Sequence, residues 1–290
     1  MSLLENILLY NIYNSMYEAL IKIISESLLA LYPVFVKNID LALDLQVWSR
    51  FFSYVIVSGF FIDYNYVYNH LFSKNGLLLS AITIAHVYTS YRGFQLLESG
   101  LSYTLFYLYP IMILMMSGRN VHPVMLVTLL GVYLLTTGNG GSSFEMMGQL
   151  EGIVMILLAG LTEAFIYFVV RRLKTDNSWN HLFLSYFAGV VIMTLFMYDK
   201  LKDVLSVSPT NILNVSIGIN VVIGLFGYLL RFFAISRLDT TLYSILSYVG
   251  VVMAYVYGML FNGDVLTLKK VMGTLCVIVP NLYLSKFRNI

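Results

Sequence analysis

Apolar residues run in long stretches along the whole chain, and short polar segments separate them. Each stretch lasts about 20 residues, the length that an α-helix needs to cross the hydrocarbon core of a bilayer. Strands of a membrane barrel would alternate apolar and polar residues, and these stretches do not alternate. The pattern predicts ten transmembrane helices, at approximately residues 17–36, 48–66, 76–97, 99–117, 122–138, 151–171, 181–198, 211–236, 240–261 and 267–285.

The composition supports the same class of protein. Of the 290 residues, 59% are apolar and 11% are charged, with a mean hydropathy of +0.80. Soluble domains carry roughly 25% charged residues, so the bilayer is the expected solvent and the fold an all-α integral membrane fold. The net charge of +2 is uninformative, but no basic cluster resembles a nucleic-acid patch, so no nucleic-acid partner is expected. The one cysteine, Cys276, excludes a disulfide framework and a cysteine-based metal site.

The longest Gly/Ser-rich polar segment, 137–152, divides the ten predicted helices into two groups of five. We therefore predict a first five-helix repeat at 1–137, a linker at 138–150 and a second repeat at 151–290, all within a single membrane domain. Because five is odd, the second repeat must enter the membrane from the opposite side. Such inverted repeats recur in secondary transporters, where the substrate site lies near the midplane between them.

The two halves align weakly, and the matches cluster in the fourth and ninth predicted helices. The matched pairs are Tyr103-Thr104 with Tyr243-Ser244, Pro110 with Gly250, and Gly131 with Gly273. Basic residues in the loops slightly favour the side that holds both termini, mainly through Arg171, Arg172 and Lys174. The positive-inside rule then predicts cytosolic termini, in the cell membrane or in a eukaryotic organelle membrane.

In the segment 231–264, small hydroxyl residues open the ninth predicted helix at 240–246 (TTLYSIL), Gly250 follows, and the helix ends at 262–264 (NGD). This order of features resembles the drug/metabolite transporter superfamily, in its EamA-like branch. The sixth predicted helix, with AGLTEA at 159–164, is similar to the start of the family's second repeat. Two departures are Asp264, where Glu is usual, and Gly250, where Pro is common.

The resemblance implies ten helices in two inverted repeats and a secondary active transporter that works by alternating access. No cofactor is expected, and the partners are a small-molecule substrate, the lipid bilayer and protons, with the protein a monomer or a homodimer. A cavity of carboxylates and tyrosines favours a small polar organic metabolite, such as an amino acid, an amine or a cofactor. An inward-facing Arg92 would instead favour an exchanger of nucleotide sugars or other anionic metabolites.

A different class stays open, namely a membrane receptor or assembly partner that does not transport. The enzyme motifs HExxH, G-x-S-x-G and GxxxxGK[ST] are absent, so no catalytic residues are expected and an enzyme is the least favoured class. No metal ligands are predicted either.

Ionisable residues at bilayer depth are costly, so each one is a candidate for function. Lys22 and Glu26 are four residues apart and share a helix face, which indicates either a gate or ion-coupling pair or an interfacial pair. Glu163 falls near the middle of the sixth predicted helix, as a proton-coupling carboxylate or as a static partner of a neighbouring side chain. His86 could bind a substrate carboxylate or transfer protons, or it could bond a Tyr or Ser of a neighbouring helix.

Three arginines and several tyrosines complete the prediction. Arg92 and Arg231 occupy related places and could clamp an anion or extend to the headgroups, with the second interpretation favoured for Arg231. Arg50 is expected to be an interfacial anchor beside Trp48. Five further residues are predicted to line the cavity, from the fourth and ninth helices: Tyr103, Tyr107, Ser244, Tyr248 and Tyr255.

Overall fold

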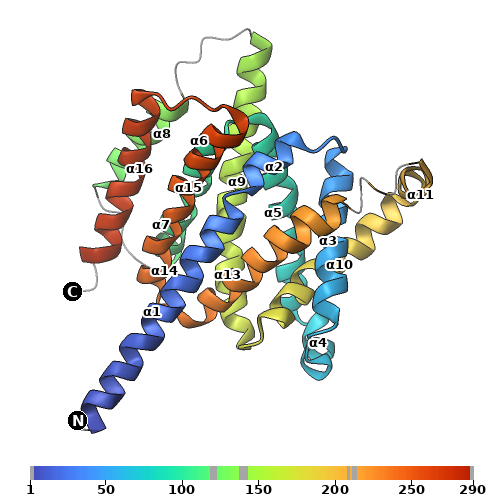
Figure 1. The fold of residues 1–290 in the computed structure, drawn as a ribbon, viewed down its shortest axis with the longest axis horizontal. Coiled ribbons are helices and arrows are strands. Elements are labelled where there is room, and N and C mark those ends of the chain that lie inside the picture. The colour runs from blue at the N-terminus through green and yellow to red at the C-terminus, as the bar shows by residue number, and fades with distance from the viewer. Residues whose placement is uncertain (1–2, 118–122, 137–142, 208–209, 211–213, 288–290) are drawn as a thin grey trace.

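The computed structural model describes residues 3–117, 123–136, 143–207, 210 and 214–287. Every regular element in these ranges is helical (Figure 1). The first half holds α1 (Leu3–Leu29), α2 (Tyr32–Asn38), α3 (Leu43–Gly59), α4 (Tyr64–Leu71), α5 (Lys74–Leu96), α6 (Ser99–Phe106), α7 (Tyr109–Met116) and α8 (Met125–Thr136). The second holds α9 (Ser143–Leu173), α10 (Ser178–Phe196), α11 (Tyr198–Val207), the π-helical η1 (Val215–Leu225), α13 (Phe226–Arg237), α14 (Thr240–Ser247), α15 (Val249–Tyr257), the π-helical η2 (Gly258–Asn262) and α16 (Leu268–Phe287).

Three of the predicted membrane helices are each broken into two segments. The α1–α2 and α6–α7 breaks each precede a proline, Pro33 or Pro110, in the first turn of the second segment. Proline lacks the N–H that a helix interior requires but fits the first turn, so it starts a new segment there. The α14–α15 break falls at Tyr248, two residues before Gly250, without a proline. The fourth and ninth predicted helices therefore break where the sequence alignment pairs Pro110 with Gly250.

Polar side chains fix several helix starts. Asp63, Ser73, Asn177 and Asp239 each accept hydrogen bonds from backbone N–H groups at the starts of α4, α5, α10 and α14. The Asp63 cap starts α4 as a separate helix, so α3 ends at Gly59 and not at the predicted limit of residue 66. Across the halves, Asp264 accepts a 2.9 Å hydrogen bond from the backbone N–H of Ser99, the first residue of α6.

The helices pack around α9 and α1. Helices α5, α6 and α7 contact α9, while α13, α14 and α15 contact α1. Helix α3 packs on α10, and α8 packs on α16 at one edge of the molecule (Figure 1). The last pair approaches closely, because a Cβ atom on Gly131 would lie 2.7 Å from the carbonyl oxygen of Gly273. The two glycines that the sequence aligns across the halves thus face each other.

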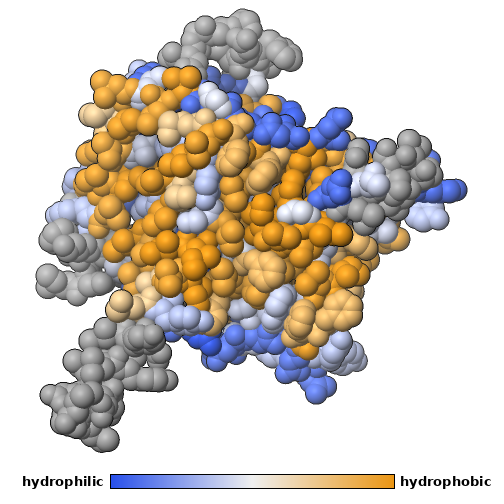
Figure 2. Space-filling model, viewed as in Figure 1, coloured by the Kyte–Doolittle hydropathy of each residue, from blue (hydrophilic) through white to orange (hydrophobic). Residues whose placement is uncertain are grey.

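The outer surface suits a bilayer. An apolar band covers the middle of the face in Figure 2, and hydrophilic residues gather along its two opposite edges. Among the described residues, six stretches are long and apolar enough to span a membrane: Met16–Asn38, Ser99–Met116, Gly148–Leu173, Ser178–Phe196, Val215–Arg237 and Thr240–Asn262. The chain is a multi-pass membrane protein.

The number of spans and the domain division stay predictions. The other four predicted spans coincide with α3, α5, α8 and α16, which are not among these six stretches. Helix α9 begins at Ser143, inside the segment 138–150 that the sequence predicts as a linker, and residues 137–142 lie outside the described part of the chain.

Candidate functional site

Four charged side chains meet at the centre of the bundle, and we call them the ionic cluster: Lys22 and Glu26 of α1, Glu163 of α9 and Arg231 of α13. Each is at most 1% exposed. Arg231 donates to Glu163 Oε1 at 2.9 Å, and to Glu26 Oε2 and Oε1 at 3.0 and 3.2 Å. Lys22 donates to Glu26 one helical turn away. Two cations and two carboxylates cancel, so the cluster is neutral as a whole.

Aromatic side chains from the broken helices surround the ionic cluster. The hydroxyl of Tyr107, at the α6–α7 break, donates to Glu26. The Lys22 ammonium lies 3.6 Å from the centre of the Tyr243 ring, in cation–π geometry. A Cβ atom on Gly250 would collide with the Tyr107 hydroxyl and lie 3.1 Å from Glu26 Oε2. The glycine therefore allows α15 to approach the cluster.

His86 of α5 borders the cluster, and its contacts indicate its tautomer. Its Nδ1 lies 3.2 Å from the carbonyl oxygen of Ala159, which can only accept, so Nδ1 carries the hydrogen. Its Nε2 lies 3.2 Å from the Tyr228 hydroxyl and 3.4 Å from Glu163 Oε2. In the neutral ring Nε2 accepts from Tyr228, and Glu163 Oε2 has no donor. A proton on Nε2 would supply that donor.

A second buried cation, Arg50 of α3, sits in a cage of tyrosines. We call this the tyrosine box, and its ring centres lie 4.5–5.6 Å from the guanidinium carbon: Tyr32, Tyr54, Tyr91, Tyr186 and Tyr228. Arg50 is 2% exposed and donates from Nη2 to the Tyr186 hydroxyl at 2.8 Å. No carboxylate of the described residues forms an ion pair with it.

A small cavity lies between the tyrosine box and the ionic cluster. Arg50, His86, Tyr103, Tyr228 and Arg231 are among the residues that line it. Its free volume is about 10 Å³, roughly what one water molecule requires. This cavity is therefore closed, with no room for an organic solute.

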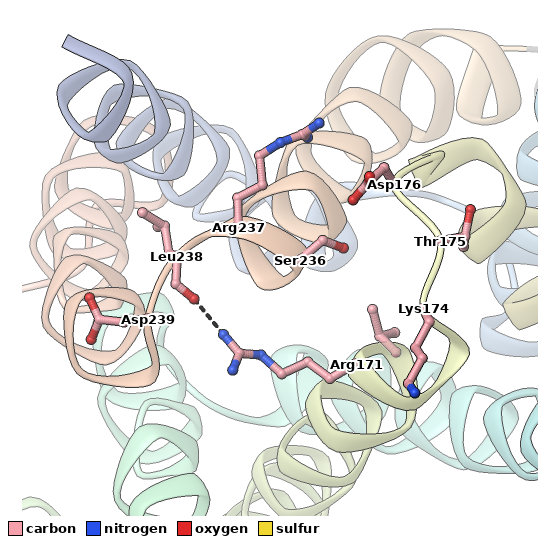
Figure 3. Close-up of a pocket in the computed structure, with 9 residues that line it drawn as sticks. Arg171, Lys174, Thr175, Asp176, Ser236, Arg237, Leu238 and Asp239 are labelled. Carbon is pink, nitrogen blue, oxygen red and sulfur yellow. Dashed lines mark hydrogen bonds between the residues drawn. The ribbon is translucent and has the colours of Figure 1, made fainter. Parts of the chain in front are cut away.

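A larger pocket of about 440 Å³ lies where α9 and α13 end (Figure 3). Charged side chains line it, and Arg171 donates to the carbonyl oxygens of Ile235 and Leu238 across it. Arg171 is eight residues beyond Glu163 on α9, about 12 Å along the helix. This pocket is thus separate from the central cavity.

Six of the predicted site residues meet at the centre. Lys22, Glu26 and Glu163 belong to the ionic cluster, and His86 and Tyr107 contact it. Tyr103 lines the central cavity and donates to the carbonyl oxygen of Leu29. Their roles in function stay predictions, but their convergence is what a cavity between two halves requires.

The other four do not bond the ionic cluster, although the ring centre of Tyr248 lies 6.4 Å from that of Tyr107. Arg92 binds Glu151 through two hydrogen bonds of 2.6 and 3.1 Å, and these side chains are 35% and 41% exposed. Ser244 donates to the Thr240 carbonyl of its own helix. Tyr255 bonds Thr274 of α16 at 2.8 Å. The buried Tyr248 hydroxyl has no hydrogen-bond partner.

Two arginines were placed wrongly from sequence. Arg231 does not extend to the headgroups, because it is buried and bonds two carboxylates of other helices. Arg50 is not an interfacial anchor, because its guanidinium lies in the tyrosine box. Trp48, its expected companion, donates instead to Thr194 at 2.8 Å. Only Tyr54, four residues from Arg50 and thus on the same helix face, hinted at this environment in the sequence.

These features define a multi-pass helical membrane protein with charged groups buried at its centre. Residues 150–283 match the model of the EamA-like transporter family, part of the drug/metabolite transporter superfamily. The match covers somewhat less than half of the chain, in its second half, and agrees with the resemblance seen in the sequence. The match indicates a membrane transporter of the drug/metabolite transporter type.

The chain is also similar to a protein of known crystal structure, with a TM-score of 0.59 and 15% sequence identity. That match covers 94% of this chain and 96% of the other chain. At this identity it shows a common fold alone, over nearly the whole length. No curated protein matches the chain.

Proposed function

We propose that the protein is a secondary active transporter of a small polar organic metabolite, working by alternating access between two inverted five-helix repeats. The observation that carries this proposal is the ionic cluster, where α1 of the first half meets α9 and α13 of the second. Taking these charges out of water costs several kcal/mol per ion, and well-packed apolar residues in the same place would not carry this cost. Buried charges at the contact of two halves suit a substrate or ion pathway.

The packing of the helices supports the inverted repeat. The contact of α5 with α9 has its counterpart in the contact of α13 with α1. The contacts of α6 and α7 with α9 correspond to those of α14 and α15 with α1, and that of α3 with η1 to that of α10 with α5. In the pairs α3–α10 and α8–α16, each helix contacts its own counterpart from the other half, so exchange of the halves leaves these two contacts unchanged. Exchange of the halves thus maps these contacts onto each other, as a two-fold axis requires.

The closed centre supports alternating access. Arg231 links α1 to α9 through two carboxylates, so opening either side of the bundle must loosen these bonds. A polar solute that enters could replace some of them with its own hydrogen bonds. Broken helices border the substrate sites of many transporters, and the α6–α7 break places Tyr107 beside Glu26.

Protons are the proposed coupling ion, and Glu163 with His86 is the proposed proton site. Their contact joins α9 to α5, while Arg231 of α13 also faces Glu163. Lys22 and Glu26 of α1 complete the charged surroundings. A proton on His86 Nε2 adds an ion pair to Glu163 and one positive charge to the centre. Uptake and release of this proton would therefore alter the energy of the closed conformation.

The test is flux through purified protein in liposomes, measured by counterflow with labelled amino acids, amines, organic acids and nucleotide sugars at several pH values. We expect flux that depends on pH in the wild type and flux without that dependence in Glu163→Gln. Glu151→Gln is the matched control, because Glu151 is a partly exposed carboxylate on the same helix. An unchanged pH response in Glu163→Gln removes the proton role. No flux of any solute refutes transport and favours a receptor or assembly partner.

The proposed orientation places both termini in the cytosol. Arg171, Arg172 and Lys174 at the end of α9 support it, because basic residues are retained on the cytosolic side. A terminal tag that is labelled from outside intact cells would contradict this orientation.

A further inference from the structure

Arg50 is a buried cation without a counter-ion. Its side chain is 2% exposed, its hydrogen-bond partners are the neutral hydroxyls of Tyr186 and Tyr91, and its Nε has no acceptor. Each carboxylate that neighbours the centre is already matched, because Glu26 and Glu163 are balanced by Lys22 and Arg231. The described centre as a whole therefore carries one excess positive charge.

The tyrosine box does not remove that charge. Its ring faces attract the guanidinium through their quadrupoles, but a phenol ordinarily keeps its proton until about pH 10. The hydroxyls of Tyr32 and Tyr54 bond each other at 2.8 Å, and Tyr91 donates to Asn220 Oδ1 at 3.2 Å. These bonds are between neutral groups. The box thus holds Arg50 in place and leaves its charge uncompensated.

A second buried donor without an acceptor belongs to another residue that lines the central cavity. The Nε of Arg231 is buried and has no acceptor, and both Arg50 and Arg231 line that cavity. A guanidinium presents a planar set of N–H donors that fits a carboxylate. Two guanidiniums with unfilled donors on one cavity form a site for an anionic group, and neither belongs to a fully satisfied structural pair.

We propose that the transported solute is an organic anion with a net charge of −1 whose carboxylate binds between Arg50 and Arg231 as the missing counter-ion of Arg50. This assignment rests on the proposed function and names its substrate class. The single excess charge selects a monocarboxylate. A phosphate monoester carries about −1.5 to −2 at neutral pH and would overcompensate it. A cationic amine would add a second uncompensated charge beside Arg50.

The test uses thermal unfolding of the purified protein in detergent. The probes are pools of a deproteinised extract of the cells that express it, separated on an anion-exchange column into unbound, weakly retained and strongly retained solutes. The unbound pool holds cations, zwitterions and neutral solutes, and the strongly retained pool holds phosphorylated ones. We expect stabilisation by the weakly retained, singly anionic pool. A ligand present at ten times its Kd raises the midpoint of a chain of this size by about 2 °C.

Variants of Arg50 tie that shift to the site. Arg50→Gln should reduce the shift to below about 1 °C, because we expect it to bind the ligand with a tenth or less of the wild-type affinity. Arg50→Lys keeps the charge without the planar fork, so we expect less than half of the shift; it also serves if Arg50→Gln does not fold. Arg172→Gln is the matched control, because Arg172 is an exposed arginine at the end of α9, and the full shift should persist.

Three results overturn the assignment. They are no shift of the unfolding midpoint with the singly anionic pool, a larger shift with another pool, or a shift in both Arg50 variants that equals that of the wild type. The liposome assay separates this failure from failure of the proposed function. Flux of an amine or neutral solute that Arg50→Gln leaves unchanged contradicts the anion site and preserves transport. Absence of all flux together with the predicted shift contradicts transport and preserves the anion site.

Discussion

Replacing Arg231 with methionine removes the guanidinium that joins α13 to α1 and α9 while keeping a side chain of similar length. Three hydrogen bonds of 2.9–3.2 Å to two buried carboxylates are lost. Glu26 keeps Lys22 and Tyr107 as partners. Glu163 keeps only His86 Nε2 at 3.4 Å, which is an acceptor in the neutral ring. Glu163 is therefore the group left as an unpaired buried charge.

Removal of one partner from a buried ion pair costs about 3–5 kcal/mol of the free energy of unfolding. For a chain of this size that corresponds to a fall in the unfolding midpoint of about 5–8 °C. The assay is thermal unfolding of purified Arg231→Met in detergent, followed by intrinsic fluorescence. In the double variant with Glu163→Gln, the unpaired charge is gone, so we expect recovery of about 1–3 kcal/mol.

Arg92→Met is the matched control for this experiment. Arg92 also binds a glutamate through two hydrogen bonds, but both partners are more than a third exposed. Exposed pairs contribute about 0–1 kcal/mol, so the expected loss is within that range. A loss below about 1 kcal/mol in Arg231→Met, or strictly additive effects in the double variant, would refute the assignment of the ionic cluster as a coupled, buried network.

Two further predictions concern hydrogen bonding and packing. Tyr186→Phe removes the hydroxyl that accepts from Arg50 Nη2 and should lower the free energy of unfolding by about 1.5–3 kcal/mol. Tyr248→Phe removes a buried hydroxyl without a partner and should be neutral or stabilising, so equal losses for the two variants in thermal unfolding would contradict this prediction. Gly131→Ala places a Cβ 2.7 Å from a backbone carbonyl oxygen of α16 and should lower the free energy of unfolding by about 1–3 kcal/mol. Gly148→Ala is the control, because its Cβ meets no atom within 4 Å and should not destabilise the protein. An unchanged stability of Gly131→Ala would show that α8 and α16 can separate at no cost.

The centre could be predicted in part because burial is visible in the helix pattern. Lys22 and Glu26 stand within an apolar stretch at helical spacing, so their pairing follows from one helix alone. Glu163 could be placed at depth by its position in the sixth predicted helix. Its partner could not, because Arg231 is 68 residues away and any of several arginines could have met it.

The ninth helix illustrates the opposite case. Ser244, Tyr248 and Tyr255 share a periodic face, which predicts a common surface but does not say which helices cover it. In the structure Ser244 bonds its own helix and Tyr255 bonds Thr274 of α16. The residue of this segment that reaches the ionic cluster is Tyr243, through the Lys22 ammonium.

The sequence by itself determined the class of this protein. Long apolar stretches and low charge require a bilayer, and a bilayer requires helices, since each backbone polar group must be satisfied within the fold. The match to the EamA-like transporter family model also follows from sequence, through residues 150–283. These properties depend on local composition and order along the chain, so no knowledge of packing was needed.

The tertiary structure decided which charges meet. Arg50 and Arg231 each lie in an apolar helix, and from sequence both had an alternative position at the membrane surface. Packing of α3 and α13 against helices from the other half placed one in the tyrosine box and the other between two carboxylates. The physical reason is that the rotation and depth of a membrane helix are set by its neighbours, which the local sequence does not specify.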